Sequence, residues 1–263
     1  MPSLLYTSEG WMDLEEQYIP GCVAAELPDG AAEACRAVAV AARTYVLRAM
    51  SADPKLGTEA KPIPNHVRFQ VFQRTAPSHI REATLSTRSV VGRYLGQLVL
   101  CNHVIGAPWD KDGNPILPDM TDTEQWVTRN SGKTGAAVKP SPISNMSRSD
   151  NRGCLSARGS DWLARHGYKY ASILRYFYGA DLDIAPIDVP PPGVPGKTPG
   201  TPTPGTTPTP NPPQPFPPAP GPNPVLPAAE PSTPPPPQQS TPGGALPLPL
   251  VAIVLALLKE GIE

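Results

Sequence analysis

Prolines are unevenly distributed along this 263-residue chain, and their distribution limits the part that can fold. Thirteen of the 39 prolines lie in residues 1–189, and 26 lie in residues 190–249. Each proline removes a backbone donor and fixes φ, so helices and sheet ladders cannot form where prolines recur at nearly every second position. We therefore predict a disordered linker over residues 186–244 and one domain of ordinary size over residues 8–185.

The composition of the proline-rich segment supports the same interpretation. Residues 190–244 carry only Lys197 and Glu230 as charges and Phe216 as an aromatic side chain. They lack the apolar area that would offset the entropy lost on ordering. Residues 245–258 follow as an uncharged run whose helix would span roughly 20 Å, short of the roughly 30 Å of a bilayer core. This tail is either a membrane or partner anchor or a disordered apolar end.

Charge and cysteine spacing exclude several classes of partner. The net charge is −1 and no run of basic residues could follow a phosphate backbone, so we expect no nucleic acid partner. No two cysteines form a C-x-x-C pair, which argues against a zinc knuckle and a thioredoxin-type motif. The first residues have neither a basic region nor an apolar stretch of about 7–15 residues, so no signal peptide is visible. Either the protein is not exported by the signal-peptide route or the true start lies upstream of Met1.

The residues around an alanine-rich segment predict the fold class. Ala31–Met50 contains eight alanines and is predicted to be a helix, buried because small residues on both faces let neighbours approach closely. Asp13 and Glu16 have capping-box spacing and open an earlier helical stretch, which Pro28 ends. We expect an α+β domain in which the central Ala-rich helix packs on a small antiparallel sheet.

Alternation and apolar spacing predict the remaining elements. Strands are expected at Phe69–Phe72 and Arg93–Val104, joined by a helix at Ile80–Ser89. Further helices are expected at Ser160–Gly167 and Tyr170–Tyr178.

Glu26 is the acidic residue best placed for chemistry. It is the only acid between Gln17 and Pro28 and lies at the end of a helical, apolar stretch. The helix dipole and the apolar surroundings both disfavour its carboxylate, so its pKa should be raised, as a general acid near neutral pH requires. The alternative is that Glu26 points into solvent from an amphipathic turn.

Several motifs resemble those of the stage II sporulation protein D family. The stretch Tyr18–Pro28 is similar to its "Y-x-x-G-V-V-A-A-E-M-P", and Ala32–Leu47 to its "A-L-K-A-Q-A-V-A-A-R-T-Y-A-L". Phe69–Phe72 resembles "C-Q-V-Y", and Leu155–Gly179 resembles the closing "L-S-Q-x-G-A … G-x-x-Y-x-x-I-L-x-x-Y-Y". The resemblance covers roughly residues 11–182 and is weakest in the middle.

The resemblance implies a peptidoglycan lytic transglycosylase with Glu26 as catalytic acid. The family cleaves the MurNAc–GlcNAc bond of glycan strands and prefers strands stripped of stem peptides. Glycosidases that use water or their own nucleophile normally need two carboxylates. In a transglycosylase the 6-hydroxyl of the sugar attacks, so one glutamate can act first as acid and then as base, and no cofactor is expected.

Four further positions match the family and are candidates for substrate binding, each with a structural alternative. Arg43 could contact substrate or form a buried ion pair. Tyr45 could simply belong to the core. Gln70 is favoured as functional because burying an unpaired amide is costly. Ser156 is favoured as structural, since serines in turns usually bond local backbone groups.

The sequence departs from the family pattern at three places. Ala157 replaces the glutamine of "S-Q", and residues 151–154 replace "G-H-G-V-G". Arg68 and Phe69 replace the His-Cys zinc ligands of some members, so no zinc is expected there. A metal site built from residues 101–103 and Cys154 is less favoured than buried thiols or disulfides. Among the disulfide connectivities, we prefer the pairs Cys101–Cys154 and Cys22–Cys35.

Three functional hypotheses remain from the sequence. The first is an envelope-directed lytic transglycosylase. The second, suggested by Ala157, is a non-catalytic glycan-binding module that enhances a partner cell-wall amidase. The third is a structural tether whose tail anchors it. From the expected substrate alone, we expect the protein to be located in the cell envelope. A phage-borne lysin that is delivered by another route would reconcile this location with the missing signal peptide.

Overall fold

The computed structural model describes residues 3–116 and 123–187. The linker predicted over residues 186–244 lies outside the described residues beyond residue 187, and so does the whole of the apolar tail at residues 245–258. The domain boundaries at residues 8 and 185 stay a prediction. Within the described ranges, no helix has both the length and the apolar character needed to cross a membrane.

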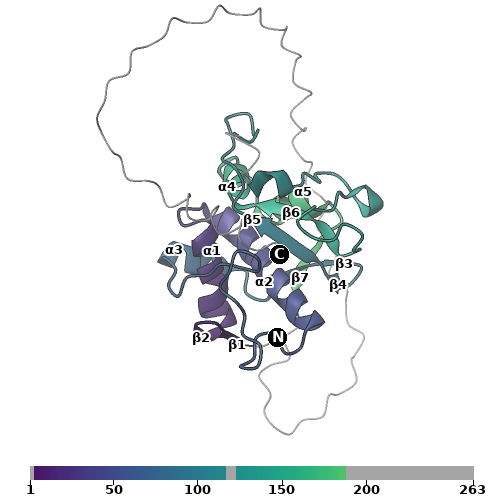
Figure 1. Ribbon diagram of the computed structural model, residues 1–263. Helices are drawn as coiled ribbons and strands as arrows, with labels where there is room; N and C mark the ends of the chain where they lie inside the picture. The colour runs from purple at the N-terminus through teal and green to yellow at the C-terminus, as the bar shows by residue number, and fades with distance from the viewer. Residues whose placement is uncertain (1–2, 117–122, 188–263) are drawn as a thin grey trace, which may run out of the picture. The chain divides into compact units, whose positions relative to one another are not determined.

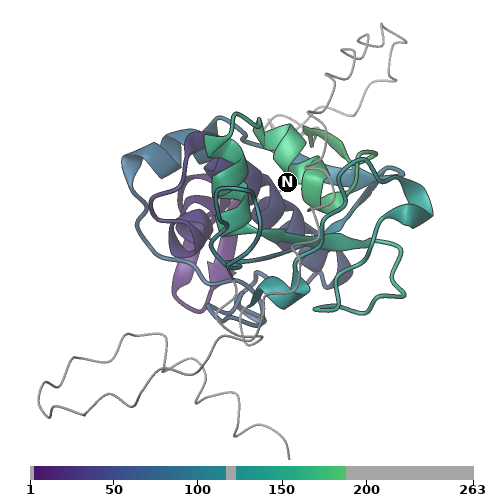
Figure 2. The ribbon, with the colours of Figure 1, turned by 90° about the horizontal axis from the view of Figure 1, so that it is seen from above.

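A long central helix organises the described part of the chain. Helix α2 (Ala32–Ala52) buries small side chains over most of its length and closely matches the predicted Ala31–Met50. Figures 1 and 2 show it inside the fold with other elements around it. It packs against strands β3 (Val90–Tyr94) and β5 (Leu100–Val104). It also packs against four helices, which are α1 (Ile19–Glu26), α3 (Ser78–Leu85), α4 (Ala157–Arg165) and α5 (Tyr170–Tyr178). Alanines permit this density of neighbours because they add little width to the helix.

Short strands form three separate sheets in the described residues. The first is an antiparallel hairpin of β1 (Leu4–Thr7) and β2 (Gly10–Asp13). The second has the antiparallel order β4-β3-β7, and its strands are Gln97–Leu98, Val90–Tyr94 and Asp183–Pro186. The third pairs β5 (Leu100–Val104) with β6 (Asn151–Ser156) in parallel. The predicted α+β class is confirmed, and the parallel pair is an addition to the expected antiparallel sheet.

The predicted N-cap at Asp13 is present, but its capping box is closed by a different residue. The Asp13 carboxylate accepts hydrogen bonds from the backbone N–H groups of Glu15 and Glu16, each at 2.8 Å. The return bond comes from the Asp13 N–H to Gln17 rather than Glu16, at 2.8 Å. The first turn, Leu14–Tyr18, is a π-helix. Because a turn of π-helix holds more residues than a turn of α-helix, it brings the Gln17 side chain, one residue later than Glu16, within reach of the Asp13 N–H.

The predicted strand at Phe69–Phe72 is wrong. Gln70 forms only isolated bridges, to Asn65 and His66. The Asn65 side chain accepts from the Phe72 N–H at 3.0 Å and donates to the Phe72 carbonyl at 2.9 Å. An amide side chain therefore takes the place of a neighbouring strand and holds this segment as a loop.

The predicted strand at Arg93–Val104 is also wrong as one element. The chain reverses after β3 at Leu95 and Gly96, whose φ angles are +50° and +76°. Two successive positive φ values are typical of the tight type I′ hairpin turn. Gly96 was a visible turn signal, whereas leucine seldom adopts positive φ.

The ends of three predicted helices can be compared with the structure. Helix α3 ends at Leu85, before the predicted Ser89. Helix α4 begins at Ala157 instead of Ser160, because the Ser156 side chain caps it. Helix α5 has the predicted bounds. In its described part, the polar segment between β5 and β6 contains two 3₁₀ turns, Thr123–Trp126 and Gly135–Ala137.

Candidate functional site

Glu26 is the last residue of α1, and a tight connection leads from it into α2. Leu27 leaves helical geometry, and Gly30 packs so closely on it that a Cβ at position 30 would lie 2.4 Å from the Leu27 side chain. The Ala31 N–H then donates to the Asp161 carboxylate on α4 at 2.8 Å. The end of α1 is therefore fixed against two other helices, which holds Glu26 in one place.

The Glu26 carboxyl group is in an environment that favours its protonated form. The residue is half-buried, and its Oε2 atom is buried without a hydrogen-bond partner among the described residues. Burial raises the pKa of Glu26 to about 7. The predicted rise in pKa is confirmed, whereas the catalytic role stays a prediction. A buried, unpaired carboxyl oxygen costs free energy, so this position suits a group that exchanges a proton with a bound molecule.

Glu26 shares one face of its helical segment with Tyr18 and Cys22. The three residues are spaced by four, so their side chains follow one another along the same face. Burial raises the pKa of the Cys22 thiol above its usual value, with a smaller contribution from the Glu26 carboxylate. The four-residue spacing of Tyr18, Cys22 and Glu26 is visible in the sequence, although only Glu26 is a candidate on sequence grounds.

Gln70 joins this face to the rest of the fold. Its Oε1 atom accepts a hydrogen bond from the Tyr18 hydroxyl at 2.8 Å, and its amide nitrogen lies 3.3 Å from both the Ala42 carbonyl and His103 Nε2. His103 Nδ1 lies 3.0 Å from the Cys101 carbonyl, which can only accept, so Nδ1 carries the proton and Nε2 accepts from Gln70. Gln70 is thus buried with both ends of its amide bonded within the protein.

Tyr45 packs beside this network. Its ring meets those of Phe69 and His103 edge-on, with centroids 5.3 and 5.9 Å apart. Burial lowers the pKa of His103, which keeps its imidazole neutral. Tyr45 is only partly buried, so it remains a candidate for substrate contact, while His103 is a neighbour that the family motifs did not indicate.

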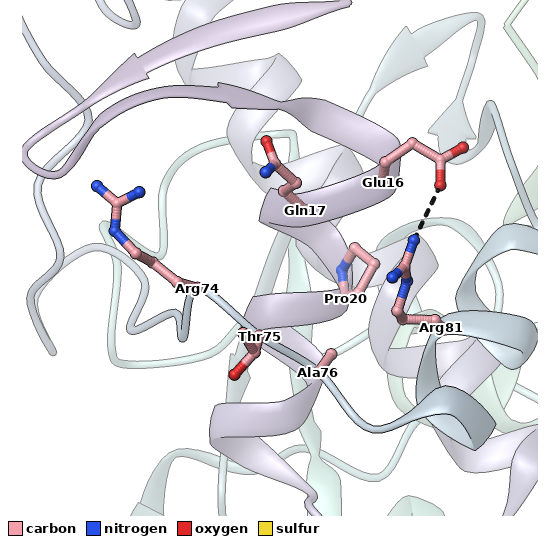
Figure 3. A pocket seen from close by; sticks show the side chains of 7 residues that line it. All are labelled: Glu16, Gln17, Pro20, Arg74, Thr75, Ala76 and Arg81. Carbon is pink, nitrogen blue, oxygen red and sulfur yellow. Dashed lines mark ion pairs between the residues drawn. The ribbon is translucent and has the colours of Figure 1, made fainter.

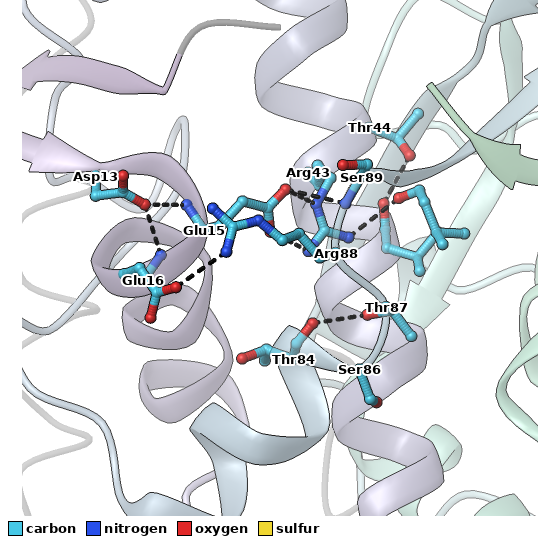
Figure 4. A network of polar contacts seen from close by, with 12 residues as sticks. Asp13, Glu15, Glu16, Arg43, Thr44, Thr84, Ser86, Thr87, Arg88 and Ser89 are labelled. Carbon is cyan, nitrogen blue, oxygen red and sulfur yellow. Dashed lines mark hydrogen bonds and ion pairs between the residues drawn. The ribbon is translucent and has the colours of Figure 1, made fainter. Parts of the chain in front are cut away.

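Arg43 does not line a cleft. Its side chain is fully buried and donates to both Glu15 carboxylate oxygens, at 2.8 and 2.6 Å, and to the Val90 carbonyl at 3.0 Å. The Ser89 N–H also donates to Glu15 at 3.2 Å. Figure 4 shows this network between α2, the π turn and the start of β3. The structural ion pair that was the alternative for Arg43 is therefore present, and a contact between Arg43 and substrate stays an untested prediction.

Ser156 also has a structural role. Its hydroxyl is buried, caps α4 by accepting from the Gly159 N–H at 2.9 Å, and lies 3.4 Å from the Ile105 carbonyl. Gly106 packs directly on it, since a Cβ there would lie 2.1 Å from the Ser156 hydroxyl. Ala157 is buried as well. The structural alternative expected for Ser156 is confirmed.

All four cysteines are free and buried, so the preferred pairings Cys101–Cys154 and Cys22–Cys35 are wrong. The strand register explains the first case: Cys154 is opposite Asn102, and successive side chains of a strand point to opposite faces. The Cys35 thiol instead donates to the Gly30 carbonyl at 3.4 Å. In the described part of the chain, no three His, Cys, Asp or Glu side chains come together to hold a metal ion.

Glu124 is a further buried carboxylate that was not singled out from the sequence. It accepts from the Ala107 N–H at 3.0 Å and from Arg129 at 3.3 Å. Burial raises the pKa of the Cys154 thiol, and the carboxylates of Glu124 and Glu26 both add to this rise. Both acids therefore lie near enough to Cys154 to act on it electrostatically. Glu124 lies in a polar segment without strong periodicity, so the sequence carried no signal for its burial.

The raised pKa of Glu26 predicts a stability effect with a definite pH dependence. The folded state holds this proton more tightly than the unfolded state, so the stabilising contribution is complete below about pH 4.5 and is lost as the pH rises through 7. The substitution Glu26→Gln removes this pH dependence of the folding stability. We expect the variant to gain roughly 2–3 kcal/mol over the wild type between pH 5 and pH 8, measured by urea unfolding. The exposed Glu59→Gln is the control; equal pH dependence of wild type and Glu26→Gln would contradict the burial of this carboxyl group.

Comparison with models of known protein families relates part of the chain to a family. Residues 10–94 match a family model described as stage II sporulation protein. This range includes the end of α1 with Glu26, all of α2, and Gln70. No curated protein matches the chain.

Proposed function

The chain carries a domain of the stage II sporulation protein D family, which is associated with cell-wall degradation, and from this premise we propose that it is a peptidoglycan lytic transglycosylase. The proposed substrate is a glycan strand free of stem peptides, cut at its MurNAc–GlcNAc bond. Glu26 is the proposed catalytic residue. The observation that carries the proposal is the pKa of about 7 that burial gives Glu26 within the matched segment.

The proposed reaction uses one carboxyl group twice. Protonated Glu26 donates its proton to the glycosidic oxygen, and the C1–O bond of MurNAc breaks. The 6-hydroxyl of the same MurNAc attacks C1 and forms the 1,6-anhydro ring, while its proton passes to the Glu26 carboxylate. No water is consumed, and the acid is restored. A pKa near the working pH suits a group that must give and take a proton in one cycle.

The neighbours of Glu26 have supporting roles in this proposal. Tyr18, Gln70 and His103 form a bonded network that fixes the position of α1. Tyr45 is partly exposed beside this network and is the side chain we propose to contact a sugar ring. The proposed location is the cell envelope, where the substrate is found, and a cell-wall amidase acting on stem peptides is a proposed partner.

The test is incubation of the full chain with denuded glycan strands, followed by mass spectrometry of the soluble products. We expect fragments that end in 1,6-anhydro-MurNAc, formed faster at pH 6 than at pH 8, because the acid form of Glu26 is lost above pH 7. Absence of such ends at both pH 6 and pH 8 would contradict the proposal.

A non-catalytic glycan-binding module is the second candidate. Ala157 favours this candidate, because its buried side chain is a methyl group at the position where the family carries a glutamine amide. Retention of glycan by the wild type without any cleavage, together with faster release of stem peptides by an added amidase, would support this alternative.

A further inference from the structure

A cavity lies at the far end of α2 from Glu26. Its volume is about 920 Å³. The residues that enclose it come from the end of α2, the β3–β4 hairpin, and the loop before β6; those used below are Arg48, Arg93, Gln97, Ser147, Arg148, Ser149 and Asp150. Arg48 lies sixteen residues beyond the first residue of α2, which corresponds to roughly 24 Å along the helix axis.

The single carboxylate among these residues is already engaged by arginines. Asp150 accepts from Arg48 at 2.8 Å and from Arg148 at 2.9 and 2.7 Å. Burial alone would raise the pKa of Asp150, but the two guanidinium groups outweigh it and lower the pKa. Asp150 therefore holds Arg48 and Arg148 in fixed positions at the cavity, and it has little remaining capacity to accept another donor.

Arg93 provides a third positive charge that nothing neutralises within the described residues. It lies in β3 opposite Asp183 of β7. Within the described ranges, its guanidinium group forms neither an ion pair with Asp183 nor a hydrogen bond. The side chains of Gln97, Ser147 and Ser149 add donors around it. The cavity is thus rich in donors and carries an excess of positive charge.

A cavity near the start of α1 shows the opposite arrangement. Its volume is about 490 Å³, and Figure 3 shows its lining side chains. Glu16 pairs there with Arg81 at 3.5 Å, and Arg74 pairs with Glu9 at 3.1 Å. Its charges are compensated within the protein, so it has no comparable excess of positive charge.

The geometry points to the cavity at Arg93 as a binding site for a phosphate group. Guanidinium groups pair most strongly with oxyanions, and a phosphate offers several acceptor oxygens in different directions. The donors here come from three separate elements, which suits a tetrahedral anion better than a planar carboxylate with two oxygens. The volume exceeds that of a single phosphate ion, so the cavity has room for a ligand that carries its phosphate on a larger body. This inference does not depend on the proposed function of Glu26.

The experiment measures binding to the full ¹⁵N-labelled chain by amide NMR spectra at low salt, where charge interactions are least screened. The probes are inorganic phosphate, glycerol 3-phosphate, a poly(glycerol phosphate) and acetate. We expect phosphate-dependent shifts of the amides of Gly96, Gln97 and Ser149. Arg93→Gln should weaken glycerol 3-phosphate binding about tenfold. The melting temperature should stay unchanged, because the Arg93 guanidinium group has no partner to lose among the described residues. The exposed Arg158→Gln is the matched control.

Each outcome bears on the inference. Tighter binding of the polymer than of the free anions would identify a phosphate-bearing polymer as the ligand, and equal binding would identify a small phosphate compound. Acetate binding as strongly as phosphate would overturn the phosphate assignment in favour of an acidic peptide. Equal affinities of wild type and Arg93→Gln, or no shifts with any phosphate probe, would overturn the site.

Discussion

Glu26→Gln is expected to lower the rate of glycan cleavage by about 10²–10⁴-fold. Glutamine has nearly the same shape as the protonated glutamate, so the fold and the contacts of α1 should persist. It cannot donate a proton to the glycosidic oxygen or take one from the 6-hydroxyl, so both proposed steps lose their catalyst. The measurement is the initial rate of 1,6-anhydro end formation from denuded glycan by the full chain.

The control for this substitution is Glu59→Gln, which makes the same change at an exposed position. It should cleave at the wild-type rate. Glycan retention should be similar in all three proteins, because only proton transfer is removed. A Glu26→Gln variant with undiminished cleavage would refute the assignment of Glu26 as the catalytic acid.

Arg43→Met is expected to destabilise the fold by about 3–5 kcal/mol. Both partners of the Arg43–Glu15 pair are almost completely buried, so removing the guanidinium group leaves the Glu15 carboxylate uncompensated in the interior. The Val90 carbonyl also loses its donor. Urea unfolding at pH 7 measures the free energy of unfolding directly.

A double variant separates the ion pair from substrate binding. Glu15→Leu combined with Arg43→Met removes both charges, and we expect it to recover much of the lost stability, since buried pairs can often be replaced by apolar side chains of similar volume. It should also cleave glycan at close to the wild-type rate. A stable Arg43→Met protein that had lost glycan binding would show instead that Arg43 contacts substrate.

The features that sequence reasoning predicted well depend on local chemistry. The central helix followed from its alanines, and helix α5 from the apolar spacing of Ile173, Leu174 and Phe177. The raised pKa of Glu26 followed from its place at the end of an apolar helix. Each of these inferences needs only neighbours along the chain, which the sequence displays directly.

The features that sequence reasoning missed depend on contacts between distant segments. Arg43 became structural because Glu15, far from it in sequence, lies within reach. The strand expected at Phe69–Phe72 became a loop because the Asn65 side chain took its backbone hydrogen bonds. The buried carboxylate Glu124 arises in a segment without periodicity. Such pairings are set by tertiary packing, for which local patterns carry no signal.

Glu124 makes the choice between transglycosylation and hydrolysis the central question. Hydrolysis normally requires a second carboxylate, and Glu124 lies near Cys154, as Glu26 does. Cleavage of denuded glycan in H₂¹⁸O decides between the two reactions. The proposed transglycosylation should give new MurNAc ends that are 1,6-anhydro and contain no ¹⁸O, because the attacking oxygen comes from the sugar. Reducing MurNAc ends labelled with one ¹⁸O atom would contradict it.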